Sequence, residues 1–200
     1  MPKTILFLAL LLPTSAPSLH AQLEYHARLG AIGASTLLRD IIVDEISVRQ
    51  SIAPMLALGA SLPIGTQGYR VGLDGTLVSG KFHSRESGSN TDLGTLRTAT
   101  LQLGLEGPMH KGFRWHVGAG GITYWPADDE GIFRDGGTTR FLAGAGIDYR
   151  RPVLPKWDLM TTLSYDFHRF STGELEARGF GQTQGVSRVA LSVGLSRGAR

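Results

Sequence analysis

Three residues in the stretch "DFHRFSTGELE" could carry out nucleophilic acyl transfer: His168, Ser171 and Glu174. The histidine would act as general base toward the serine hydroxyl, and the carboxylate would orient the imidazole. In an extended strand, however, side chains alternate between two faces, so His168 and Ser171 point in opposite directions. A hydrogen bond between them requires the strand to end or bulge there, and we therefore predict no catalytic residue.

Metal and phosphate chemistry has little support from the residue spacing. The loop "ADDEG" places Asp128, Asp129 and Glu130 near Asp135, but this spacing does not match a calcium-binding EF-hand loop. The stretches "GAGG" and "GAGAG" have the glycines of a phosphate loop without the strand-to-helix transition that such a loop needs. The chain contains no cysteine, which excludes thiolate ligands and disulfides. We predict no metal site and no cofactor.

Strands are the elements that must position these residues. Apolar and polar residues alternate with a period of two in eight segments, and none of the segments has a helical pattern. The links between segments alternate between short ones such as "GPMHKG" and long ones such as "PADDEGIFRDGGTT". This alternation is typical of an antiparallel up-and-down barrel. The predicted strands are residues 23–34, 46–63, 69–82, 93–106, 113–125, 140–150, 157–169 and 186–197.

The stretch "LQLGLEG" shows the two faces of such a strand, with Leu101, Leu103 and Leu105 on one face and Gln102 on the other. Lysine is confined to Lys3, Lys81, Lys111 and Lys156, and the last three lie in predicted loops or turns, so the polar face is not an ordinary wet surface. That polar face is mostly Gly, Ala, Ser and Thr, which suits a narrow lumen. The apolar face is therefore predicted to contact lipid.

Aromatic residues support the same assignment, because they lie on the apolar face near the strand ends and would form two girdles at the membrane interfaces. Those beside the short links are Tyr25, Tyr69, Phe113, Trp115, Tyr149 and Trp157, and those near the long links are Trp125 and Phe167.

The amino end has the form of a secretory signal peptide. Lys3 precedes an apolar run from Ile5 to Leu12, and small and polar residues follow up to Ala21. We expect cleavage after Ala21, which divides the chain into a signal peptide (1–21) and one barrel domain (22–200). The formal net charge of +3 is too small, and the arginines too dispersed, to indicate nucleic acid as a partner.

The signal segment and the alternating stretches "RVGLDGTLVSG", "ATLQLGLEG" and "RVALSVGLS" resemble the OmpA/OmpX-type small outer-membrane β-barrels. The resemblance implies an all-β, eight-stranded antiparallel up-and-down transmembrane barrel in the outer membrane of a Gram-negative-type bacterium. It also implies a monomer that contacts outer-membrane lipid and the outer-membrane assembly machinery. The expected role is non-enzymatic, with a structural, adhesive or protective effect exerted through long external loops on an unknown partner.

Two other functions stay open at this stage. Some outer-membrane barrels are lipid-modifying enzymes such as the lipid A deacylases, but the His-x-Ser spacing of that family is absent here. A change in lipid A mass on expression would identify such an enzyme. The third hypothesis is a soluble periplasmic lipocalin-like barrel that binds a ligand, and heat-modifiable migration of detergent-extracted protein would exclude it.

The polar face is predicted to form a lumenal network of paired charges. Pairing across the short links places Glu106 opposite Arg114, and Arg150 opposite Asp158, so we expect these two ion pairs above the turns. The remaining charges are expected deeper in the lumen. The complete predicted network is Arg49, Arg70, Asp74, Gln102, Glu106, Arg114, His116, Asp148, Arg150, Asp158, Asp166, His168 and Arg188.

Overall fold

The computed structural model describes residues 23–41, 45–86, 89–127, 131–134, 136–177 and 184–198. The predicted signal peptide lies outside these residues, as do Asp128, Asp129, Glu130 and Asp135 of the acidic loop. None of the helices in the described part of the chain has the length and hydropathy of a membrane span. The strands of the ring are β1 (Glu24–Ala34), β3 (Glu45–Gln50) with β4 (Ala53–Ile64), β5 (Tyr69–Glu86), β6 (Ser89–Pro108), β7 (Phe113–Pro126), β8 (Thr138–Leu154), β9 (Trp157–Phe170) and β10 (Gln184–Arg197).

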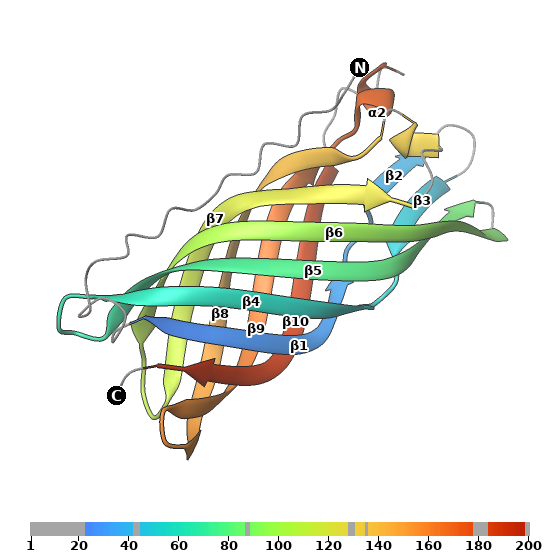
Figure 1. The fold of residues 1–200 in the computed structure, drawn as a ribbon. Coiled ribbons are helices and arrows are strands. Elements are labelled where there is room, and N and C mark those ends of the chain that lie inside the picture. The colour runs from blue at the N-terminus through green and yellow to red at the C-terminus, as the bar shows by residue number, and fades with distance from the viewer. Residues whose placement is uncertain are drawn as a thin grey trace, which may run out of the picture.

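These strands form a closed antiparallel barrel (Figure 1). Each pairs with its neighbour in the chain, and β1 pairs with both β4 and β10, which closes the ring. Because β3 and β4 both pair with β5, they form one interrupted strand of the wall. The prediction of an eight-stranded up-and-down barrel is confirmed.

The three short connections are tight turns at one end of the barrel. In the β6–β7 connection, the Met109 amide donates to the Phe113 carbonyl, and Lys111 and Gly112 both have positive φ values (53° and 86°). Glycine adopts this conformation without a steric penalty, and Lys111 tolerates it as an isolated turn residue. Lys156, with φ of 66°, closes the β8–β9 turn in the same way.

The other end of the barrel is more regular than predicted, because short elements occupy parts of the expected loops. The 35–45 link contains β2 (Leu38–Ile41), which pairs with β3 beyond the barrel wall. β5 and β6 continue to Glu86 and Ser89, so Lys81 and His83 lie in a strand and not in a loop. The last two links contain a 3₁₀ turn, η1 (Gly131–Phe133), and a short helix, α2 (Gly173–Ala177). None of the eight segments predicted as strands is helical, and α2 lies in the link between the last two.

The predicted facing of the strands is confirmed except at β3. Leu103 and Leu163 are 63% and 53% exposed on the outer wall, and Val117 and Val193 are exposed beside them. Ser192, which follows Leu191 on β10, is buried in the interior. Apolar side chains thus cover the outside, as expected for a wall in lipid and not for the surface of a lipocalin-like barrel in water.

The second predicted strand departs from the expected alternation. On the β5 side, Gln50 pairs with Phe82 and Met55 pairs with Val78, so five steps along β3 and β4 oppose four along β5. The extra residue is a bulge at residues 51–52, and it reverses which side chains face inward. Arg49 is consequently exposed on the outer face, where its Nε donates to Thr36 Oγ1 at 3.0 Å.

Candidate functional site

Five charged side chains contact one another in the interior beside the short turns, and we call them the Arg–Glu cluster: Glu24, Arg70, Glu106, Arg114 and Arg150. Glu106 contacts all three arginines, with N···O distances of 2.7 Å to Arg150, 3.3 Å to Arg70 and 3.6 Å to Arg114. Glu24 contacts Arg150 and lies 3.7 Å from Arg70. Arginine suits this arrangement because its planar fork can serve two carboxylates at once.

The cluster differs from the two ion pairs predicted. The register of each hairpin is shifted by two residues from the predicted one. Glu106 therefore lies opposite His116, and Arg114 lies opposite Pro108. Arg114 still reaches Glu106, because a shift of two residues keeps both side chains on the inner face. On the next hairpin, Asp158 lies opposite Pro152 and Arg150 lies opposite Met160. Arg150 contacts Glu24 and Glu106, so the predicted pair of Arg150 with Asp158 was wrong.

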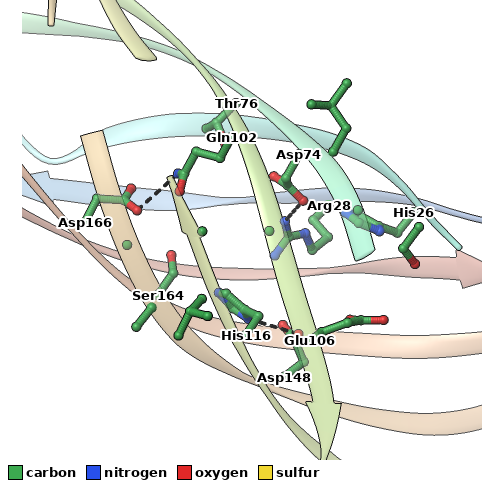
Figure 2. Close-up of a pocket in the computed structure, with 18 of the residues that line it drawn as sticks. His26, Arg28, Asp74, Thr76, Gln102, Glu106, His116, Asp148, Ser164 and Asp166 are labelled. Atoms are coloured by element: carbon green, nitrogen blue, oxygen red, sulfur yellow. Dashed lines mark hydrogen bonds and ion pairs between the residues drawn. The ribbon is translucent and has the colours of Figure 1, made fainter. Parts of the chain in front are cut away.

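Two aspartates organise the polar groups at mid-lumen (Figure 2). Asp74 Oδ2 accepts hydrogen bonds from His26 Nε2 and Arg28 Nη2, both at 2.6 Å. Asp148 is bound at 3.1 Å by His116 Nδ1 and at 2.6 Å by the Thr162 hydroxyl. These bonds compensate for the desolvation of carboxylates inside a narrow barrel.

Glycine provides the space for these side chains. A methyl group at Gly146 would lie 2.5 Å from the His116 ring, and one at Gly59 would overlap the His26 ring. The remaining space is a cavity of about 100 Å³ lined by His26, Arg28, Asp74, Gln102, His116 and Asp148, among others. Its walls could hold a few water molecules, which usually occupy polar cavities of this kind.

A buried polar group lies above this cavity. The Tyr124 hydroxyl is 2.6 Å from His168 Nε2, and the two side chains are 1% and 2% exposed. Arg188 is also buried, with its Nη2 3.5 Å from Thr98 Oγ1. Gln102 Nε2 donates to Asp166 at 3.2 Å and links this level to the cavity.

Apolar side chains close the lumen at the long-loop end. We call this group the loop-end plug, and Phe133 of η1 packs at its centre with ring centroids 6.0 Å from both Phe82 and Phe170. Its members are Leu37, Val48, Phe82, Leu96, Ile122, Tyr124, Phe133, Leu142, Phe170, Leu175 and Val186. The lumen is therefore obstructed at both ends, by charge pairs at one and by aromatic packing at the other.

Arg140 helps to fix the helix α2 over the plug. Arg140 Nη2 donates to the Ser171 carbonyl at 2.8 Å and to Glu176 Oε1 at 3.1 Å, and Leu175 points into the plug. The Ser171 hydroxyl also donates to Glu176 at 2.8 Å. His168 Nε2 is thus engaged by Tyr124, and the Ser171 hydroxyl is engaged by Glu176. The geometry therefore offers no imidazole base to Ser171.

The structure brings most of the predicted network together inside the barrel. The exception is Arg49, which the bulge places on the outer face. Sequence reasoning missed Glu24, His26 and Arg28, although the alternation of β1 places them on the polar face like the other network residues. Among the described residues, no group of three or more His, Cys, Asp or Glu side chains could hold a metal ion.

Comparison with solved structures assigns the fold. Neisserial surface protein A matches 88% of this chain and 96% of its own, with a TM-score of 0.56 and 13% identity. The outer membrane protein OprG from Pseudomonas aeruginosa matches 88% of this chain and 95% of its own, with a TM-score of 0.53 and 11% identity. The chain has the fold of a small outer-membrane β-barrel.

A third similar outer-membrane barrel was solved within a lipid bilayer. The outer membrane protein AlkL, in DMPC bilayers, covers 98% of this chain and 96% of its own, with a TM-score of 0.57 and 13% identity. No protein-family model matches the chain, and no curated protein matches it. The similarity therefore concerns the small outer-membrane barrel as a fold, and the role of this barrel must be argued from its own residues.

Proposed function

We propose that this protein is a non-enzymatic barrel of the Gram-negative outer membrane that acts through its long-loop end, exposed outside the cell. The observation that carries the proposal is the closure of the lumen at both ends. The Arg–Glu cluster fills the short-turn end, and the loop-end plug fills the other. Because its lumen is closed, such a barrel serves as a membrane anchor that supports the strands and loops exposed at its long-loop end.

The strands beyond the plug are the part of the molecule that such a barrel would expose. β2, β3, β5 and β6 continue the sheet past the barrel wall, and in Figure 1 β2, β3 and the β5–β6 tip lie at the end away from the short turns. Regular pairing gives this extension a defined surface, which a structural, adhesive or protective role would use. That this extension binds an external partner stays a prediction from the sequence.

A lipid-modifying activity has no support in the site geometry. His168 and Ser171 are both buried, whereas a lipid-modifying triad must reach the lipid-facing edge. Ser171 also lacks an imidazole partner, because its hydroxyl donates to Glu176.

Conductance measurements test the closed lumen. We expect the purified barrel, reconstituted into planar lipid bilayers, to show no stable unitary conductance, because eight strands leave an interior that side chains fill. A general porin in the same bilayers provides the control. Reproducible ion channels from the unaltered protein would contradict the proposal and indicate a transport role.

A further inference from the structure

Two cations on the outer wall at the long-loop end are positioned differently from the lumenal charges. Arg97 lies on β6 with its Cα paired to Ser79 on β5 and to Trp125 on β7. Its side chain is exposed. It shares the outer face with Leu101, which lies four residues further along β6. Among the described residues, no carboxylate lies within 4 Å of the Arg97 guanidinium group to form a salt bridge.

Lys81 occupies the next level on the neighbouring strand. It pairs with Thr95, which lies two residues before Arg97 on β6. The Cα atoms of Lys81 and Arg97 are therefore about 8 Å apart. Both side chains are long enough to reach a common ligand across this distance. The Lys81 side chain is 73% exposed, and its Nζ lies 2.9 Å from Asp92 Oδ2, which partly neutralises it.

The residues around Arg97 and Lys81 indicate the depth of these two cations in the membrane. Leu77 and Leu101 are exposed immediately below them in the band of apolar residues, and the exposed Trp125 lies beside Arg97. Tryptophan on a barrel wall marks the boundary between hydrocarbon and headgroups. An outward arginine at the same height faces lipid headgroups and not the aqueous loops.

We propose that Arg97 and Lys81 form a binding site for the phosphate of a lipid headgroup in the outer leaflet, of the kind carried by lipid A. The assignment of the leaflet rests on the proposed function, since it requires the long-loop end to face outward. Arg97 supplies a planar fork for two phosphate oxygens, and Lys81 supplies a point charge. Leu77 and Leu101 lie where the acyl chains of the same lipid would pack.

Trp125 allows this site to be tested locally. The chain has three tryptophans, so Trp115→Phe with Trp157→Phe leaves Trp125 as the only fluorescent indole. We would titrate this variant in detergent micelles with bisphosphorylated lipid A, with dephosphorylated lipid A and with inorganic pyrophosphate. Because micelles leave both ends of the barrel accessible, the result does not depend on its orientation in cells.

We expect saturable changes in Trp125 emission with bisphosphorylated lipid A and much weaker binding of dephosphorylated lipid A. Each cation near a lipid surface contributes about a fivefold gain in affinity, so Arg97→Gln should weaken binding about fivefold, and Arg97→Gln with Lys81→Gln about thirtyfold. Asp92→Asn should strengthen binding, because it releases Lys81 from its salt bridge. Equal saturation by pyrophosphate would show a free-phosphate site and overturn the lipid assignment.

Arg169→Gln is the matched control. Arg169 is also exposed on the outer wall, but it lies on β9, opposite Gly185 and separated from the strand of Trp125 by β8. In this variant, the affinity for bisphosphorylated lipid A reported by Trp125 should stay within about twofold of that of the unaltered protein. This change is smaller than the loss expected on removal of one phosphate-binding cation. Equal loss in Arg169→Gln and Arg97→Gln, or no loss in Arg97→Gln, would overturn the proposal.

Discussion

Replacing Glu106 by glutamine is expected to lower the free energy of unfolding by about 3–5 kcal/mol, because it leaves buried cations without their counter-charge. Glu106 is the carboxylate that contacts all three arginines of the Arg–Glu cluster. After the substitution, Glu24 still contacts Arg150 and Arg70, whereas Arg114 loses the carboxylate that it contacts in the cluster. Denaturant titration of the barrel folded into lipid vesicles would measure the change.

The control for this experiment is Arg114→Gln, which removes one partner of the same cluster. Glu106 keeps Arg150 at 2.7 Å and Arg70 at 3.3 Å, so no carboxylate loses all its partners. The expected cost is about 0–1 kcal/mol, in the range of a replaceable ion pair. Equal costs for the two substitutions would mean that the cluster is solvated and does not hold that end of the barrel together.

Replacing Leu103 by arginine is expected to cost about 2–4 kcal/mol when the protein is folded in a bilayer, because the charge then faces hydrocarbon midway along the wall. Leu103 is 63% exposed on the outer wall, with Leu73 and Ala119 as its paired neighbours. The same titration in vesicles measures the cost.

Asn90→Arg is the matched control, because Asn90 is exposed on the same strand in the part that extends beyond the wall. A surface substitution of this kind should change the free energy of unfolding by less than about 0.5 kcal/mol. A cost for Leu103→Arg as small as that for Asn90→Arg would mean that Leu103 does not face lipid.

The alternation of side chains was sufficient to predict the facing of the strands. A period of two places Leu101, Leu103 and Leu105 on one side in any register, so small errors in strand ends leave the faces unchanged. Errors of two residues in the turns likewise kept Arg114 within reach of Glu106.

Features that depend on odd shifts or on tertiary packing could not be predicted in this way. One extra residue at residues 51–52 moved Arg49 from the lumen to the outer face, and bulges of this kind leave no distinct signal in composition. The loop-end plug had a signal that was overlooked: Leu96, Ile122 and Leu142 are apolar residues on the polar side of the alternation. They mark the level at which the interior changes from paired charges to aromatic packing.

Cysteine labelling of intact cells would test the membrane insertion of the barrel and its orientation together. The chain has no cysteine, so Asn90→Cys at the β5–β6 tip and Met109→Cys at a short turn each introduce a single reactive thiol. A membrane-impermeant maleimide should label Asn90→Cys on intact cells, and should label Met109→Cys only after the outer membrane is permeabilised. Labelling of Met109→Cys alone on intact cells would contradict the proposed orientation, and protection of both positions until permeabilisation would contradict exposure of the long-loop end.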